Sequence, residues 1–445
     1  MLTWLSKHVF LPLWEIKDGS HRRQYLRELS ASQWLDRDTL YKRQWGRVRE
    51  AVEYAFKHCP HYREHLSAVS PDGRLRDWGH FKRLPLLTKQ EVRGNGDRLL
   101  SHEFRREDLV EARTGGSTGV ALKLYFDKRC QEMRNAAAMR SDQWAGWDIG
   151  MKVAAIWGNP PVADTLKKKL RKLLLDRSIY LDTMDINDLG VLQFVREWRL
   201  MKPRVIFGHS HSIYILAKYL QKLDVGDLRP EGIISTSMML LAPEREFIEQ
   251  VFRCQVTNRY GCEEVGLIAC ECEQHNGMHL NLDHLVVEFL REDGSDSDPG
   301  ENANIVVTDL INRGMPLIRY CVGDMGVPSN RSCACGRGQP LMEQITGRQA
   351  DFLKRPDGSL VAGVSLVERT LTAIPGIEEM QLVQNELHLL LVKLVVGTRF
   401  AYEAEKALRQ ELKSVFGEAV AIQIQYLSNL DQSSTGKYRF AICNV

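Results

Sequence analysis

The spacing of hydrophobic residues predicts a helical beginning followed by alternating strands and helices. Trp45, Val48, Val52 and Phe56 recur at three- and four-residue intervals, which predicts an amphipathic helix over residues 40–59. From Leu109 onward, short β-rich runs such as KVAAIW, RVIFG and GIISTS alternate with helical stretches. This alternation favours an α/β fold with a largely parallel, doubly wound sheet.

Towards the C-terminus the pattern changes twice. Between Tyr260 and Arg348 strands dominate, as in HLVVEFL and ANIVVTDL, and predict a β-rich subdomain at 260–347. The remainder predicts a hairpin around RPDGS, a helix from Val364, two strands, a helix over AYEAEKALRQELKSVF and a last strand AIQIQYL. We therefore expect a large domain of residues 1–347 and a small α+β domain of residues 348–445.

A basic amphipathic run, LKKKLRKLLLDR, begins at residue 166. Helical spacing places Leu166, Leu170, Leu173 and Leu174 on one face and the lysines on the other. Isolated charge runs usually do no more than solvate a helix, so we favour an ordinary surface helix over a site for a membrane or an acidic partner.

Composition excludes several classes of protein. The chain has 445 residues, of which 44% are hydrophobic, enough for a large core and two to three domains. Its 60 basic and 57 acidic residues give a net charge of only +3, so no nucleic-acid partner is expected. The first apolar run is interrupted by Lys7 and Pro12 and lacks a cleavage site. We expect a cytoplasmic protein with no integral membrane segment.

The cysteines are unevenly distributed. Of ten, seven fall between Cys254 and Cys335, which in a cytosolic protein suggests metal binding more than disulfides. The run CECEQHNGMH and the later CACG supply thiols and imidazoles that suit a closed tetrahedral Zn²⁺ site, whereas the alternative is a set of reduced free cysteines. The candidate ligands are Cys270, Cys272, His275, His279, Cys333 and Cys335.

The loop TGGSTG, residues 114–119, combines backbone freedom with hydroxyl donors. Such a loop can turn its N–H groups towards phosphate oxygens. No Gly-Lys-Ser/Thr ending follows, so it is not a Walker loop, and the string alone is more often an ordinary turn.

The order of further motifs changes this interpretation. After the loop come NRYGCEEVG (258–266), TDL with MPLIRYCVGD (308–324), TGRQAD (346–351) and SSTGKYRF (433–440). Together they resemble the adenylate-forming superfamily, in its branch of phenylacetate-CoA ligases and CapK-type relatives, over nearly the whole chain. The resemblance implies an adenylation domain at 1–347 and a mobile C-terminal lid domain at 348–445. It also implies an enzyme that joins a carboxylic acid to ATP as an adenylate and passes the acyl group to a thiol or an amine.

Site roles carry over by residue. The resemblance implies Mg²⁺ binding by Glu264, ribose-phosphate contact by Arg348, and bridging of the carboxylate and α-phosphate by Lys437. It selects Cys272 over Cys270 and gives a structural Zn²⁺ site of Cys272, His279, Cys333 and Cys335. The implied nucleotide-binding residues are Thr114, Gly116, Ser117, Thr118, Gly119, Ser237, Tyr260, Gly261 and Asp324.

Two positions depart from the family pattern. Glu263 stands where many relatives have threonine, and Ala350 replaces a charged hinge residue. His209 and His211 lie in the region that lines the acyl pocket of the family, although a packed or surface histidine is the better interpretation of either.

The resemblance favours coenzyme A as the acyl acceptor, with a carrier protein or an amine as the alternative. A homodimer is compatible with this expectation. A nucleotide-binding regulatory protein without catalysis is the second alternative, and the presence of Glu264, Asp324, Arg348 and Lys437 argues against it.

Overall fold

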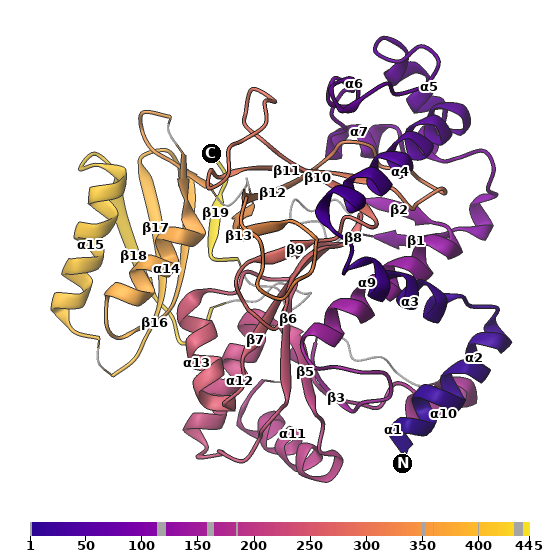
Figure 1. The fold of residues 1–445 in the computed structure, drawn as a ribbon. Helices are drawn as coiled ribbons and strands as arrows, with labels where there is room; N and C mark the ends of the chain where they lie inside the picture. The colour runs from indigo at the N-terminus through magenta and orange to yellow at the C-terminus, as the bar shows by residue number, and fades with distance from the viewer. Residues whose placement is uncertain are drawn as a thin grey trace.

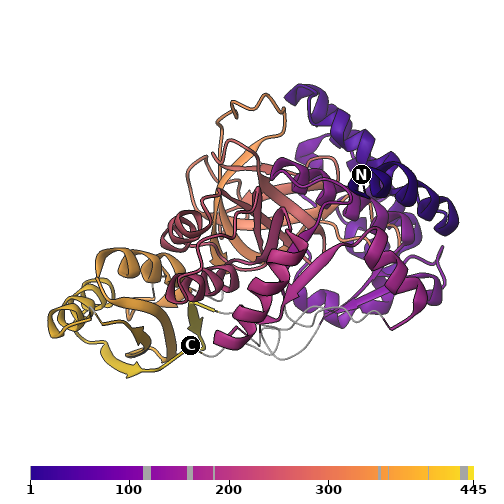
Figure 2. The same cartoon turned by 90° about the horizontal axis from the view of Figure 1, so that it is seen from below.

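The computed structural model describes residues 2–113, 122–157, 164–183, 186–348, 352–358, 360–398, 400–430 and 439–445. Figure 1 shows a central sheet between the N-terminal helices and a smaller C-terminal unit. Figure 2 shows these parts in a row, with the C-terminal unit at one end and the first helices at the other. This architecture confirms the predicted α/β class.

Helices make up most of the first hundred residues. The predicted amphipathic helix is α4, which Asp36 caps by accepting a hydrogen bond from the Thr39 N–H. Its buried face packs in the main core together with α5 and strands of the large sheet. The helices of this region are α1 (Leu2–Leu5), the π-helical turn η1 (Ser6–Phe10), α2 (Leu11–Asp18), α3 (Arg22–Ser32), α4 (Arg37–His58), α5 (Pro60–Ser67), α6 (Trp78–Lys82), α7 (Lys89–Gly94), α8 (Gly96–Leu99) and the 3₁₀ turn η2 (Arg106–Asp108).

The centre of the molecule is an 11-stranded sheet in the order β10-β11-β12-β13-β9-β8-β7-β6-β5-β3-β4. Strands β3, β5 and β6 of its parallel half are largely apolar and buried, as expected of a sheet covered on both faces. That half consists of β3 (Val153–Ile156), β4 (Ser178–Leu181), β5 (Val205–His209), β6 (Gly232–Thr236) and β7 (Val256–Cys262).

Five helices, α9 to α13, occur along the same part of the chain as the parallel strands. Residues of α11, α12 and α13 share a core with strands β3 to β7. These helices lie together beside the strands in Figure 1, and α9 lies on the other side. The bounds are α9 (Lys128–Trp144), α10 (Leu166–Leu174), α11 (Asp188–Met201), α12 (Ser210–Lys222) and α13 (Ala242–Phe252).

The strands between Tyr260 and Arg348 continue the same sheet in antiparallel pairing. The predicted β-rich region is thus hydrogen-bonded directly to the parallel strands. Its strands are β8 (Gly266–Glu271), β9 (Met278–Leu280), β10 (Leu285–Leu290), β11 (Ala303–Asp309), β12 (Tyr320–Pro328) and β13 (Leu341–Arg348), and a separate ladder joins β1 (Val110–Arg113) to β2 (Lys123–Phe126).

The C-terminal unit has its own four-stranded sheet, β18-β17-β16-β19, and its own core around Leu382, Val392 and Leu412. The predicted hairpin, helices and strands all occur in the predicted order. They are β14 (Phe352–Lys354), β15 (Leu360–Ala362), α14 (Gly363–Ala373), β16 (Ile377–Glu386), β17 (Leu389–Val396), α15 (Tyr402–Phe416) and β18 (Ala421–Tyr426), followed by β19 (Ala441–Cys443).

A buried ion pair fixes α9 against the antiparallel half. The Arg140 guanidinium is 1% exposed and donates to Asp283 Oδ2 at 2.9 Å and to Asn281 Oδ1 at 3.1 Å. Ser32 at the end of α3 donates to the same Asp283 oxygen. Burial opposes ionisation of Asp283, but Arg140 and the surrounding donors hold the pKa of that carboxyl below its usual range.

We expect Arg140→Leu to lower the free energy of unfolding by about 3 kcal/mol or more, because it leaves the Asp283 carboxylate buried without its principal cation. Urea unfolding at neutral pH measures this change. The control is Arg409→Leu, which removes an i,i+4 pair on the surface of α15 and should cost at most about 0.5 kcal/mol. Equal effects of the two variants would contradict the structural role of Arg140.

Candidate functional site

The β7–β8 hairpin carries the first group of site residues. A Cβ atom at Gly261 would lie 2.4 Å from the Gly266 carbonyl oxygen, so only glycine fits this close approach. Gly266 itself has φ +76°, in the region that favours glycine. Arg134 of α9 donates to the Glu263 carbonyl oxygen at 2.6 Å and fixes the turn from outside. The turn therefore directs Glu264 into the protein.

Glu264 is a buried carboxylate, 4% exposed, with two close partners. The Tyr320 hydroxyl donates to its Oε1 at 3.0 Å, and Lys89 Nζ lies 3.3 Å from the same oxygen. Burial alone would raise the pKa of Glu264, but the charge of Lys89 and the hydrogen bonds hold it below its usual range. The carboxylate is thus ionised at neutral pH in a largely apolar setting.

Asp324 lies close to Tyr260 although 64 residues separate them and β13, β9 and β8 stand between β12 and β7 in the strand order. The Tyr260 hydroxyl donates to Asp324 Oδ2 at 2.8 Å. In the β12–β13 ladder the backbone of Asp324 is paired with that of Arg348. The structure therefore brings Tyr260, Gly261, Asp324 and the backbone of Arg348 into one region of the sheet.

Ser237 follows the last residue of β6, in the register where Thr236 pairs with Arg259 of β7. It has φ +66°, unusual for a residue other than glycine, and it is exposed. Ser237 therefore lies next to the β7 segment that contains Tyr260. A strained, exposed hydroxyl at the carboxyl end of a parallel strand is typical of a ligand-binding position.

Several predicted residues lie outside the described part of the chain. These are the loop residues Thr114, Gly116, Ser117, Thr118 and Gly119, the hinge position Ala350, and Lys437, and for Arg348 the structure describes the backbone alone.

Lys89 and Tyr320 were not predicted as site residues. Lys89 opens the short helix α7, which Thr88 and Glu91 cap reciprocally, and nothing in that local pattern points to a distant carboxylate. Tyr320 stands within the RYCVGD motif, but its hydroxyl is directed to Glu264 rather than to Asp324. Both contacts depend on the tertiary fold.

The predicted zinc ligands converge. One ligand atom from each of Cys272, His279, Cys333 and Cys335 lies within 4.8 Å of all the others. Cys272 directly follows β8, His279 belongs to β9, and the two later cysteines lie in the β12–β13 connection. Cys270 is buried but does not belong to this group.

The chemistry of this group suits Zn²⁺. His279 Nδ1 lies 3.3 Å from the Gln339 carbonyl oxygen, so a proton on Nδ1 leaves Nε2, which is 3.4 Å from Cys335 Sγ, for a cation. Burial lowers the pKa of His279 to about 4, which keeps the imidazole neutral. Three thiol sulfurs and one neutral imidazole nitrogen make the donor set of a closed structural site.

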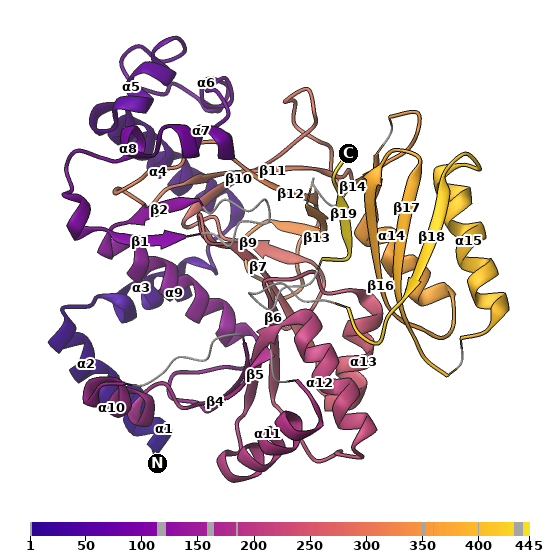
Figure 3. The same cartoon turned by 180° about the vertical axis from the view of Figure 1, so that it is seen from behind.

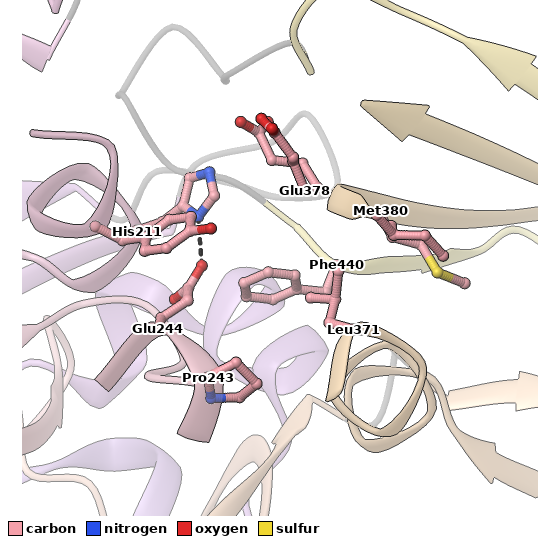
Figure 4. A pocket seen from close by; sticks show the side chains of 10 residues that line it. His211, Pro243, Glu244, Leu371, Glu378, Met380 and Phe440 are labelled. Atoms are coloured by element: carbon pink, nitrogen blue, oxygen red, sulfur yellow. Dashed lines mark hydrogen bonds and ion pairs between the residues drawn. The ribbon is translucent and has the colours of Figure 1, made fainter. Parts of the chain in front are cut away.

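A cavity of about 100 Å³ lies between α12, α13 and the C-terminal unit (Figure 4). In it the buried His211 Nδ1 lies 2.6 Å from Glu244 Oε1, and the Phe440 ring stands edge-on to the imidazole at 6.0 Å. On the other wall, Glu378 pairs with Lys218 at 2.8 Å. His211, like His209, is thus a packed histidine, and it contributes to the contact between the two units.

Comparison with known proteins finds relatives over most of the chain. Residues 353–444 match the CapK C-terminal domain family. The chain is 24% identical to protein CapK of Staphylococcus aureus, covering 91% of this chain and 90% of that protein. It is 26% identical to phenylacetate-coenzyme A ligase of Thermus thermophilus, with 77% of each covered. The chain is thus similar over most of its length to CapK and to a phenylacetate-coenzyme A ligase, and its C-terminal unit matches a CapK domain.

Solved structures show the same fold. 2-Hydroxyisobutyryl-CoA ligase in the postadenylation state aligns with a TM-score of 0.74 at 18% identity, covering 93% of this chain and 91% of that one. The same ligase in its thioesterification state, with 2-HIB-AMP and CoA, aligns with a TM-score of 0.61 at 17% identity, covering 93% and 91%. The class of enzyme that these relatives support is an adenylate-forming ligase.

The His211–Glu244 pair makes the stability of this ligase depend on pH. Burial opposes the charge on His211, but Glu244 outweighs it and raises the pKa of His211 above the usual value. The stabilisation is therefore fully present below about pH 6.5, where the unfolded histidine is also protonated. It is lost as pH rises through the raised pKa of the folded histidine.

We expect Glu244→Gln to lower the melting temperature more at about pH 6 than at about pH 9, since the charge pair contributes little once His211 is neutral. Thermal melting of the wild type and of Glu244→Gln across this pH range measures the effect. The control variant is His58→Gln, which removes a histidine of α4 that lies outside the His211–Glu244 pair. A constant difference between wild type and Glu244→Gln at every pH would contradict a charged pair.

Proposed function

We propose that this chain uses ATP and Mg²⁺ to activate a carboxylic acid as an acyl- or aryl-adenylate, and transfers the acyl group to coenzyme A. The observation that carries the proposal is the buried, ionised Glu264 in the same sheet region as the Tyr260–Asp324 pair. An ionised carboxylate is a hard oxygen donor of the kind that Mg²⁺ prefers. An aspartate held by a tyrosine hydroxyl can accept from two ribose hydroxyls.

The roles of the described residues follow from their positions. Glu264 would hold Mg²⁺, which when bound neutralises phosphate charge. Tyr320 and Lys89 keep the Glu264 carboxylate oriented and ionised. Asp324 would bind the ribose, and Tyr260 would orient Asp324 while its ring lies along the nucleotide. Ser237 and Gly261 border the same space.

The remaining roles rest on the sequence motifs. We assign the phosphates to the loop of Thr114, Gly116, Ser117, Thr118 and Gly119. Arg348 would contact the ribose-phosphate. Lys437 would neutralise the charge that accumulates between the attacking carboxylate and the α-phosphate, a task that needs positioning rather than covalent chemistry. The division at residues 347 and 348 then separates an adenylation domain from a lid domain.

The arrangement of the two units is closer to one state of a neighbouring CoA ligase than to another. The same neighbouring ligase aligns better in its postadenylation state than in its thioesterification state, with TM-scores of 0.74 and 0.61. Coenzyme A is the favoured acceptor because the ligases in the comparison are CoA ligases. A carrier-protein thiol or an amine is the alternative acceptor, since the chain also aligns over most of its length with protein CapK.

We further propose a structural Zn²⁺ held by Cys272, His279, Cys333 and Cys335. Its surroundings fit such a role, because the Arg337 guanidinium stacks near Trp144 and Trp34 and donates to Gln33 at the end of α3. The cluster thereby joins the β12–β13 connection to the N-terminal helices.

The test of the proposed function is ATP–pyrophosphate exchange with a panel of aryl and aliphatic acids, followed by mass spectrometry with CoA or amines. With the active acid, Glu264→Gln should lower the exchange rate by about a hundredfold, because the neutral amide keeps the size of the side chain and loses the metal-binding charge. Glu263→Gln, the adjacent residue, is the matched control and should change the rate little.

Exchange at the wild-type rate in Glu264→Gln, with loss in Glu263→Gln, would move the metal to Glu263. Tight ATP binding without exchange for any acid would favour the non-catalytic, regulatory alternative. Product formation with amines and none with CoA would identify an amide ligase.

For the zinc site we expect about one Zn²⁺ per chain in protein purified without chelator, and nearly none in Cys335→Ser, because three ligands do not retain a structural zinc in competition. Elemental analysis measures the metal, and thermal melting should show that Cys335→Ser is less stable. Cys270→Ser is the control, since Cys270 is buried nearby but outside the cluster. If Cys270→Ser lost its zinc and Cys335→Ser kept it, Cys270 and not Cys335 would be the zinc ligand.

A further inference from the structure

Three of the four leucines of α10 are exposed, and the fourth, Leu174, packs against a core cluster. Leu166, Leu170 and Leu173 have exposed fractions of 83%, 47% and 64%. The sequence predicts an ordinary solvated surface helix, and the structure shows that its leucine stripe is exposed as well as its lysines. Three exposed leucines at i, i+4 and i+7 form a continuous stripe on the helix. Such a patch marks an interaction surface.

Cations border this stripe. At 100° per residue, Lys169 lies beside the leucines on one edge and Lys167 on the other. The helix LKKKLRKLL contains five cations and no acid. Acids outside the helix offset some of this charge, since Lys167, Lys168 and Arg171 pair with Asp18, Asp164 and Asp176 respectively. The helix itself therefore combines an apolar stripe with basic margins.

The neighbouring N-terminal helices extend the apolar surface. The Trp14 ring of α2 lies 5.8 Å from both Lys167 Nζ and the Arg171 guanidinium, and Ser6 donates to the Leu174 carbonyl oxygen. These helices expose Trp4, Leu13 and Ile16 by 61%, 61% and 78%. Figures 1 and 3 both place α10 against α1 and α2, at the end of the molecule away from α15.

A basic cavity opens at the same end. It has a volume of about 300 Å³ and is lined by Leu2, Thr3, Lys152, Arg177, Lys202 and Arg204. Arg204 pairs with Glu231, whereas Lys152 and Arg177 donate to backbone carbonyls, those of Met201 and Gly150. The cavity thus keeps a surplus of positive charge and suits an anionic group such as a phosphate.

We propose that α10, together with α1–α2 and the basic cavity, is a docking surface for a membrane that contains anionic phospholipids. In this arrangement the leucines enter the boundary between headgroups and acyl chains, and the lysines on both margins extend to the headgroups. A positively charged margin without acids in the helix complements an anionic bilayer. Among the described residues, no helix has the length and apolar character needed to cross a membrane, so contact through this face would be peripheral.

Flotation with vesicles tests the proposal on the full chain. We expect binding to vesicles of phosphatidylcholine mixed with phosphatidylglycerol, weakening as salt rises, and little binding to phosphatidylcholine alone. Leu170→Glu should reduce binding about tenfold or more. The control is Tyr402→Glu, which places the same charge at a residue of α15 that is 78% exposed and lies at the other end of the molecule.

Charge is tested separately. Lys169→Glu should reduce binding about fivefold or more, because one lysine near an anionic surface contributes about that factor. Lys406→Glu on α15 makes the same change in net charge and should have little effect. All four variants should keep the wild-type rate of pyrophosphate exchange without vesicles, so failure of the membrane proposal is distinguishable from failure of the enzymatic one.

Absence of binding to the anionic vesicles, or equal binding by wild type and Leu170→Glu, would overturn the proposal. Equal binding to the two vesicle types would overturn its electrostatic part. If vesicles are not bound but sedimentation shows a dimer that Leu170→Glu dissociates, the face is an interface between two copies of the chain and not a membrane surface.

Discussion

The close approach of β7 and β8 at Gly261 is the constraint on which the rest of the structure depends. A side chain at this position would meet the Gly266 carbonyl oxygen, so glycine alone permits the chain to reverse within Cys262–Gly266. That reversal changes the sheet from parallel to antiparallel pairing. It also turns Glu264 inward, where Tyr320 of β12 and Lys89 of α7 hold it. Arg134 of α9 donates a hydrogen bond to the turn. The parallel strands, the antiparallel strands and α9 therefore meet at this hairpin.

An ionised carboxylate in such a place needs compensation. Burial raises the cost of the charge, and one cation and a tyrosine hydroxyl on the same oxygen offset it. In the proposed function, Glu264 would bind Mg²⁺ as a second cation beside Lys89. The Tyr260 hydroxyl likewise orients the Asp324 carboxylate, which in the proposed function would bind the ribose.

The sequence predicted the fold class, the order of elements in the C-terminal unit, and which of Cys270 and Cys272 belongs with the other cysteines. The first two follow from periodicity, and the third followed from motif resemblance. The contacts of Lys89 and Tyr320 with Glu264 could not be predicted, since neither local pattern encodes a partner far away in the chain.

For α10 the periodicity predicted a helix correctly, but amphipathicity separates two faces without saying which one is covered. The exposure of Leu166 is decided by what packs against the helix.

Two of the proposed zinc ligands and two of the proposed nucleotide-binding residues belong to the β12–β13 hairpin. Cys333 and Cys335 lie in the connection from β12 to β13, and these strands carry Asp324 and Arg348 in paired positions. A Zn²⁺ bound at this connection would hold β12 and β13 together at the end where the connection lies. At the opposite end of the hairpin, the backbone pairing of the two strands aligns Asp324 with Arg348. Metal loss should therefore lower stability more than it alters the geometry of the nucleotide site in chains that remain folded. The proposed zinc site and the proposed nucleotide site are thus linked through the β12–β13 pair of strands.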